Sequence, residues 1–190
     1  MAVDVERVRA AIAELLDAIG EDVTREGLRE TPRRVADMYA ELFSGIDADP
    51  GRHLRVQFDA DHDEMVMLRD IPFTSLCEHH LVPFMGVVHL AYLPGPTGRI
   101  TGLSKLARLV EGFARRLQVQ ERMTVEIADA IDKDLQPRGA LVVIEAEHLC
   151  MSMRGVRKPG TTTITSSVRG TFRSDPATRA EALEFVHKRR

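Results

Sequence analysis

The stretch Ser75-Leu76-Cys77-Glu78-His79-His80-Leu81-Val82-Pro83-Phe84 carries one thiol and two imidazoles within four residues. The segment Glu147-His148-Leu149-Cys150 carries another histidine and the second cysteine. The chain has only two cysteines, and each lies within three residues of a histidine. We interpret this pairing as the sign of a metal site around which the fold is organised.

The two segments offer a plausible set of zinc ligands. Two residues separate Cys77 from His80, a spacing common among zinc ligands, and Cys150 can supply a third ligand from a distant strand. Three protein ligands leave one tetrahedral position open, as in catalytic zinc sites, and thiolate with imidazole suits zinc better than magnesium or calcium. His79 and His148 would then lie beside a metal-bound water, where an imidazole can transfer protons near neutral pH.

Two other interpretations of these residues stay open at this point. In the first, Cys77 and Cys150 are small buried residues and the histidines form hydrogen bonds in loops. In the second, the metal is structural and His79 or His148 is its fourth ligand, which predicts no activity. Spacing alone favours the metal site over the first interpretation.

Length and composition are those of an ordinary globular protein. The chain has 190 residues, of which 44% are hydrophobic and 29% charged, so we expect one main domain with a helical extension. The net charge of −3 gives no case for nucleic acid, and no run approaches the roughly 20 apolar residues of a membrane span. Acidic residues among the first sixteen argue against a secretory signal. We expect a cytoplasmic protein, in which a metal site is favoured over a disulfide.

The first part of the chain has the apolar periodicity of helices. Apolar residues recur at helical spacing from Val5 to Ile19, and Gly20 can close this helix. Thr31 followed by Pro32 predicts a second helix, with the threonine hydroxyl as its cap. A short loop or a third, small helix is expected around residues 25–30.

The main domain follows a long connection. The region 46–63 is rich in Asp, His, Gly and Pro, with an expected strand at residues 54–58. Residues 1–62 are thus predicted to form an N-terminal helical extension and connection, and residues 63–190 the main domain. Its expected elements are strands at 65–71 and 86–93, a helix capped by Ser104, a helix from about 120 to 135, β-rich segments at 141–146 and 161–172, and a short helix opened by Asp175-Pro176.

This order of elements predicts an α+β fold. Strand, strand, helix, helix, strand, strand indicates an antiparallel four-stranded sheet with both helices on one face. Because an open sheet has two exposed edges, we expect the chain to form an oligomer.

Several polar residues have an ambiguous role by themselves. Ser104, Lys105 and Arg108 at a helix start suit an anion such as phosphate, although most such cations are simply solvated. Arg154, four residues after Cys150, could bring a further charge to the metal or lie in a solvated loop. The pair Gln120-Glu121 could bind the edge of a purine, but an acidic residue in a first helical turn is favourable without any ligand.

The motifs together resemble the GTP cyclohydrolase I family. The resemblance covers roughly residues 31–173 and rests on five blocks in family order: Thr31–Arg34, Ser75–Phe84, Gly102–Arg108, Gln118–Thr124 and Glu147–Gly155. It implies the tunnelling fold and a toroidal homodecamer with active sites between subunits. It also implies the conversion of GTP and water to 7,8-dihydroneopterin triphosphate and formate. Folate and biopterin routes both start from this product, and we take the first step of tetrahydrofolate biosynthesis as the expected one.

The resemblance also implies residue roles. Cys77, His80 and Cys150 match the family's zinc ligands, and His79 and His148 match its catalytic histidines. The residues that match substrate contacts are Ser104 near the ribose, where it also serves as a proton carrier; Gln120 and Glu121 for guanine; and Lys105, Arg108, Arg154 and Arg34 for the triphosphate.

One departure and two alternatives qualify the resemblance. Asp37 stands where relatives commonly carry a basic residue, which weakens the case for phosphate binding by that helix. A lyase similar to pyruvoyl-tetrahydropterin synthase is disfavoured, since those enzymes typically bind zinc through three histidines. A non-catalytic, zinc-stabilised oligomer that binds purine nucleotides would have no need of His79 and His148.

Overall fold

The computed structural model describes residues 3–187, so the basic end Lys188–Arg190 lies outside the described residues. The chain divides into two compact units, one ending at Ala48 and the other beginning at Asp49. Within the described range no helix is long and apolar enough to cross a membrane.

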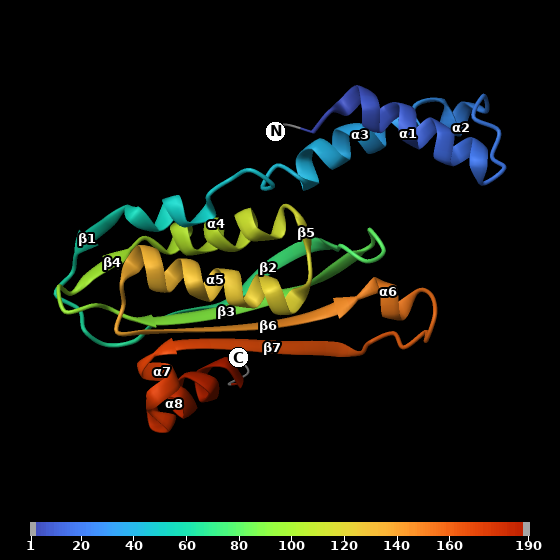
Figure 1. The fold of residues 1–190 in the computed structure, drawn as a ribbon. Helices are drawn as coiled ribbons and strands as arrows, with labels where there is room; N and C mark the ends of the chain where they lie inside the picture. The colour runs from blue at the N-terminus through green and yellow to red at the C-terminus, as the bar shows by residue number, and fades with distance from the viewer. Residues whose placement is uncertain (1–2, 188–190) are drawn as a thin grey trace. The chain divides into compact units, whose positions relative to one another are not determined.

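The N-terminal unit consists of helices, as expected. Figure 1 shows its three helices, α1 (Val5–Ala18), α2 (Glu26–Arg29) and α3 (Thr31–Leu42). Asp4 caps α1 by accepting a hydrogen bond from the backbone N–H of Arg7 at 3.0 Å. The predicted cap of α3 is wrong: Glu30 occupies that position, and the Thr31 hydroxyl instead donates to the Gly27 carbonyl at 3.4 Å. Because Glu30 already has helical backbone angles, the helix starts before the threonine can act as a cap.

The larger unit is a mixed α+β structure with a curled sheet (Figure 1). The strands lie in the order β5-β2-β3-β6-β7, and β5 alone runs parallel to its neighbour. A separate ribbon pairs β1 with β4. The bounds are β1 Gln57–Asp59, β2 Val66–Cys77, β3 Pro83–Leu93, β4 Arg99–Thr101, β5 Leu117–Gln118, β6 Gly139–His148 and β7 Thr162–Gly170.

The predicted strand at residues 54–58 is largely wrong. Pro50–Arg55 forms the 3-10 helix η1, and the strand β1 begins only at Gln57. Proline at the start of η1 suits a helical turn because its ring presets the backbone angle φ. The four long strands at 66–77, 83–93, 139–148 and 162–170 are antiparallel as predicted, and the two-residue strand β5 is an addition.

Two helices cover one face of the sheet, α4 (Leu103–Ala114) and α5 (Gln120–Leu135) (Figure 1). The apolar stripe predicted for α4 is buried, with Leu106 and Leu109 fully covered against strand residues such as Phe84 and Val88. The opposite face packs on α7 (Thr171–Ser174) and α8 (Pro176–His187) through Phe172 and Ala182. Ser104 does not cap α4 as predicted, because Gly102 occupies the cap position and Ser104 lies within the first turn.

The sheet has two ends that matter for function. At one end, which we call the cysteine end, Cys77 closes β2 and His148 closes β6. At the other, the Tyr92 end, the Tyr92 hydroxyl accepts a hydrogen bond from the N–H of Thr101, just before α4. Since a strand rises about 3.3 Å per residue, the distance along β3 from Phe84 to Tyr92 is about 26 Å.

Candidate metal centre

A tight turn brings His80 back over the end of β2. The carbonyl of Cys77 accepts hydrogen bonds from the N–H groups of His80 at 3.3 Å and Leu81 at 2.8 Å, while the Cys77 N–H donates to Val82 at 2.9 Å. Leu81 closes the turn with a φ of 55°, in the left-handed region. The turn therefore holds the Cys77 thiol and the His80 imidazole on the same side.

Cys150 reaches the same point through the register of the sheet. Phe84 lies opposite His148, so the short helix α6 (Leu149–Ser152) begins over the start of β3. The ligand atoms of Cys77, His80 and Cys150 all lie within 4.8 Å of one another. Zinc with bonds of about 2.0–2.3 Å needs donors roughly 3.3–3.8 Å apart, so these residues fit a zinc ion with little movement. The metal-ligand set predicted from spacing is thus brought together by the fold.

The cysteine thiols favour a metal over a free thiolate. Burial raises the pKa of the Cys150 thiol, and the neighbouring Cys77 raises it further. A bound cation offsets this effect, because thiols deprotonate when they coordinate a metal. A metal ion at this point would therefore stabilise the thiolate form of Cys150.

His148 is held by contacts that leave one of its ring nitrogens free. Its Nε2 lies 2.7 Å from Oε1 of Gln120, and its ring stacks on Phe84 with centroids 4.7 Å apart. The Gln120 amide nitrogen donates to the carbonyls of Ile144 and Thr163, both at 3.0 Å, so its oxygen is the acceptor. His148 therefore donates through Nε2 and keeps a lone pair on Nδ1. Burial lowers the pKa of His148, while the charge of Glu121 raises it.

This use of Gln120 was missed by sequence reasoning. The side chain is almost completely buried and its amide is engaged by the chain itself, so in this structure it orients His148. The only signal in the sequence was that Gln120 directly precedes Glu121 at a helix start. Pairing across the sheet cannot be read from such a local pattern.

Two further side chains flank the metal ligands. His79 is exposed, and its Nδ1 lies 3.9 Å from the sulfur of Cys77. Arg154 donates through Nη1 to Nε2 of His80 at 2.9 Å, because a guanidinium has no acceptor. A coordinated neutral imidazole has no lone pair left for this contact, so metal binding at His80 requires Arg154 to move away.

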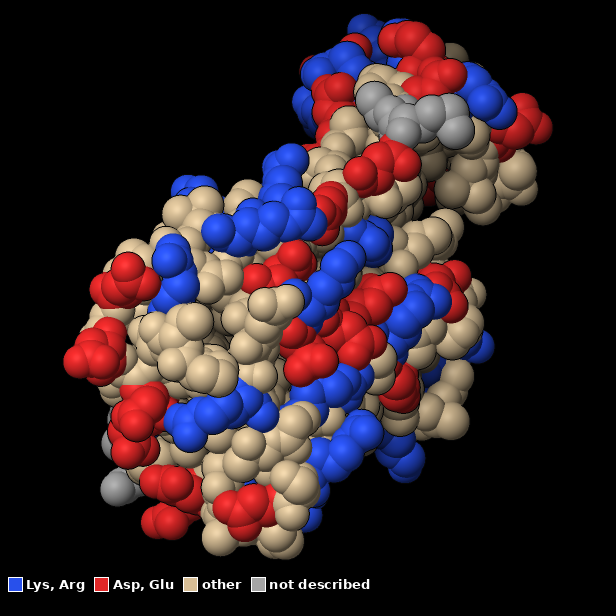
Figure 2. Space-filling model, turned by 60° about the vertical axis from the view of Figure 1, so that its left-hand side comes forward, with Lys and Arg blue, Asp and Glu red and all other residues tan. Residues whose placement is uncertain are grey.

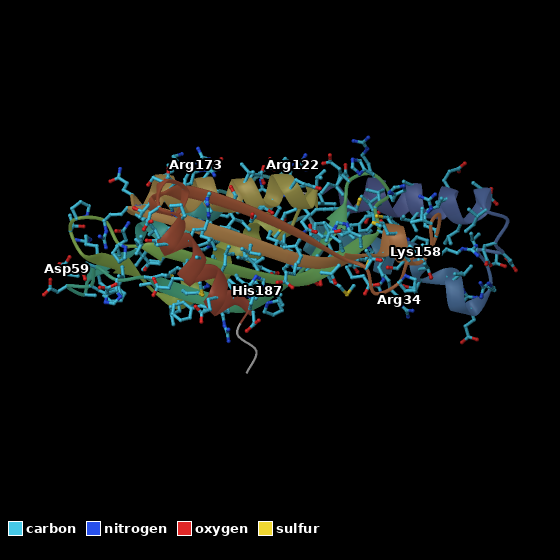
Figure 3. All side chains as sticks on the ribbon, turned by 90° about the horizontal axis from the view of Figure 1, so that it is seen from below. Arg34, Asp59, Arg122, Lys158, Arg173 and His187 are labelled. Carbon is cyan, nitrogen blue, oxygen red and sulfur yellow. The ribbon has the colours of Figure 1, made fainter. Side chains whose placement is uncertain are left out.

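The remaining predicted residues lie elsewhere. Ser104, Lys105 and Arg108 occupy the first turns of α4 at the Tyr92 end, whereas Ala114 at the other end of α4 accepts a hydrogen bond from Ser75. At a rise of about 1.5 Å per residue, Ser104 and Lys105 lie about 14–15 Å along the axis of α4 from Ala114, and Arg108 lies about 9 Å from it. In a single chain the first two therefore lie at the far end of α4 from the cysteine end, and Arg108 lies near the middle of the helix. Arg34 belongs to α3 in the N-terminal unit, as Figure 3 shows.

The start of α4 is rich in uncompensated positive charge. Among the described residues, Lys105 and Arg108 have neither a side-chain hydrogen bond nor an ion pair. Burial lowers the pKa of His53 in η1, and the charges of Arg52, Arg108 and Lys105 lower it further. Elsewhere, Figure 2 shows basic side chains interspersed with acidic ones, in keeping with the net charge of −3.

Comparison of the sequence with known proteins gives the same family from the family model and from the most similar relatives. The family model described as GTP cyclohydrolase I matches residues 8–187. The chain is 60% identical over 183 residues to GTP cyclohydrolase 1 of Mycolicibacterium vanbaalenii, covering 96% of this chain and 91% of that protein. It is 59% identical over 184 residues to GTP cyclohydrolase 1 of Carboxydothermus hydrogenoformans, covering 97% and 95%. A solved structure, the archaeosine synthase QueF-Like in the apo form, is 14% identical with a TM-score of 0.46, covering 56% and 93%.

Proposed function

Because the chain belongs to the GTP cyclohydrolase I family of hydrolases, we propose that it is a zinc-dependent enzyme that opens the guanine imidazole ring of GTP. The products are formate and, after rearrangement and ring closure, 7,8-dihydroneopterin triphosphate. We place this step at the start of tetrahydrofolate biosynthesis in the cytoplasm. The observation that carries the zinc dependence is the convergence of Cys77, His80 and Cys150 beside two histidines that do not belong to the ligand set.

The chain supplies both a metal site and proton carriers. Cys77, His80 and Cys150 would hold the zinc ion, which when bound would supply an activated water near neutral pH. His148, oriented by Gln120 and Phe84, keeps Nδ1 free to carry a proton to the ring nitrogen that leaves C8. His79 beside Cys77 is the second proton carrier.

Glu121 selects the base. Its carboxylate lies in the first turn of α5, next to the residue that orients His148, and is exposed to solvent. It accepts hydrogen bonds from N–H groups of guanine that adenine does not offer. A site that buries this carboxylate against the bound base rejects the wrong analogue by about 10⁴-fold, because the carboxylate would otherwise be left unpaired. Gln120 supports this turn from within the core.

The ribose and triphosphate require a second group of residues. Ser104 carries protons during opening of the ribose, and Lys105 and Arg108 bind phosphate oxygens. Arg154 and Arg34 add further positive charge. Cys77, His80 and Cys150 lie at the cysteine end of the sheet, and α4 begins at the opposite end. We therefore propose that each active site combines the cysteine end of one subunit with α4 of a neighbour.

The sheet edges support this assembly. β7 is an edge strand, and β5 pairs with β2 only at Leu76 and Cys77, so most of the outer edge of β2 is unpaired. Edges of this kind are normally paired or covered. We propose that neighbouring sheets pair at these edges in the tunnelling fold and close into a toroidal homodecamer.

Formate release tests the proposal most directly. Formate produced per GTP is measured on the purified protein, and its zinc content is assayed before and after chelation. Stoichiometric formate that disappears with the metal and returns with zinc supports the proposal. Zinc and GTP bound without formate would instead identify a nucleotide-binding module.

A further inference from the structure

Glu78 and Arg122 join two segments that the proposed mechanism needs side by side. Glu78 lies in the turn that carries His79 and His80, and Arg122 follows Glu121 in the first turn of α5, where Figure 3 labels it. The guanidinium Nη2 of Arg122 donates to the Glu78 carboxylate at 2.5 Å. Neither side chain belongs to the metal ligands or to the proposed substrate contacts.

The guanidinium is held in place by more than this ion pair. Nη2 also donates to the carbonyl of Leu117 at 3.1 Å, and Nε donates to Oε1 of Gln118 at 3.2 Å. Gln118 is completely buried, and its amide nitrogen donates to Phe113 at 3.0 Å and to Glu126 at 2.9 Å. The orientation of the Gln118 amide is therefore determined, and it presents its oxygen to Arg122.

This support distinguishes the pair from an ordinary surface salt bridge. Exposed ion pairs usually contribute little, because two long side chains must lose conformational freedom to form them. Here Leu117 and Gln118 already hold the guanidinium of Arg122 in place, so little further side-chain entropy is lost when it binds Glu78. The bond to Glu78 therefore acts mainly by restricting the motion of the turn. The backbone adds one hydrogen bond between the same two segments, from the N–H of Glu78 to the carbonyl of Gln118 at 3.1 Å.

We propose that Glu78 and Arg122 are positioning residues that hold the His79–His80 turn against the first turn of α5. The inference rests on the proposed function, since it assigns the pair to the alignment of proton carriers and metal with the base bound near Glu121. The two-residue strand β5 supplies few backbone hydrogen bonds by itself, so the side-chain pair sets the angle of the turn. A misplacement of about 1 Å in such a site can lower the rate about a hundredfold.

The test uses the zinc-loaded full chain and four variants: Glu78→Ala, Arg122→Ala, the double variant and Glu78→Gln. Glu111→Ala is the matched control, because it removes an ion pair to Arg115 that is also 2.5 Å long but lies on α4. The measurements are zinc content, kcat and KM for GTP, and hydrogen exchange of a peptide that covers residues 75–84. Hydrogen exchange measures how readily the backbone of this turn opens, and it does so whether or not the protein has catalytic activity.

Both single alanine variants are expected to retain zinc, to exchange this peptide about tenfold faster, and to lower kcat about 10- to 100-fold with KM little changed. The double variant should be no worse than Arg122→Ala, because that single change already removes the bond to Glu78 together with the bonds to Leu117 and Gln118. Glu78→Gln keeps an acceptor for Arg122 and should recover most of kcat. The control should match the wild type in every measurement.

Several outcomes would overturn the inference. Exchange and kcat within twofold of wild type in Glu78→Ala, or fully additive losses in the double variant, would show that the pair does not act as a unit. Zinc loss from Glu78→Ala alone would show that Glu78 acts on the metal rather than through Arg122. A wild-type protein that releases no formate refutes the proposed function, whereas faster, non-additive exchange in the variants still supports the positioning role.

Discussion

The two ends of the larger unit differ in how their polar side chains are held. At the cysteine end, His148 is fixed by Gln120, and Glu147 accepts hydrogen bonds from the Ser152 hydroxyl at 2.7 Å and from the N–H of Gly160 at 3.0 Å. At the start of α4, Lys105 and Arg108 have no such partners in the described part of the chain.

This difference matches the role proposed for each end of the sheet. Bond making needs donors and acceptors held to fractions of an ångström, and the hydrogen-bond network of the cysteine end provides that constraint. Binding of phosphate oxygens by the long, flexible side chains of Lys105 and Arg108 tolerates more movement. In the proposed assembly, catalysis and anchoring of the triphosphate would come from different subunits of the same site.

The largest expected effect is at the metal ligands. Cys150→Ser should lose zinc and lower formate release about a thousandfold, because a catalytic metal contributes several kcal/mol. Zinc analysis and formate assays on one sample check this prediction. Calorimetry should show that the variant still binds inorganic triphosphate at the start of α4. Full activity in this variant would remove Cys150 from the ligand set.

Mixing equal amounts of two variants, assayed at a GTP concentration at which neither has appreciable activity, tests whether the two ends belong to different chains. Cys150→Ser subunits are unfolded and refolded together with subunits that carry Lys105→Ala and Arg108→Ala. In a ring of randomly mixed subunits, about a quarter of the sites combine an intact cysteine end with an intact α4, so about a quarter of wild-type activity should return. Activity no greater than that of the separate variants would place the whole site within one chain.

A smaller effect is expected from single changes at the start of α4. Arg108→Ala should raise KM for GTP roughly 10- to 100-fold, since a hydrogen bond to a charged group contributes about 1.5–3 kcal/mol. Zinc content should be unchanged, and Lys133→Ala on α5 serves as the control for loss of an exposed cation. Steady-state kinetics provide the measurement. An unchanged KM would assign Arg108 to the solvated surface.

The smallest effect concerns His53. Burial and the nearby cations Arg52, Arg108 and Lys105 hold its pKa below the usual value, with Asp49 acting in the opposite direction. Its contribution to stability is therefore present above about pH 6.5 and lost as the pH falls through the lower folded value. An anion bound at α4 raises this pKa, so the affinity for inorganic triphosphate should rise a few-fold more between pH 7 and pH 5.5 in wild type than in His53→Gln.

Calorimetry in identical buffers measures this difference and removes the contribution from protonation of the triphosphate itself. If the affinity for triphosphate depends on pH equally in the two proteins, protonation of His53 is not coupled to anion binding. The melting temperature without triphosphate tests the direction of the pKa shift, because it should fall less steeply below pH 6.5 in His53→Gln.

Much of the fold could be predicted from local patterns. The helices at 5–18 and 120–135 agree with their predicted ranges because their apolar periodicity is long and regular. The caps of α3 and α4 were each misplaced by a residue or two, since that choice depends on backbone angles at the boundary. The strand β5 is too short for any pattern and exists only because α4 returns the chain to the end of β2.

The sequence by itself determined the chemistry available to this protein: two cysteines, each beside a histidine, and the blocks that place the chain in its family. Residue spacing shows which side chains are close along the chain. Only the tertiary structure decided that Cys150 meets Cys77 and His80, that Gln120 orients His148, and that α4 begins at the opposite end of the sheet. Those distances depend on strand register and helix packing, which connect residues that no local pattern relates.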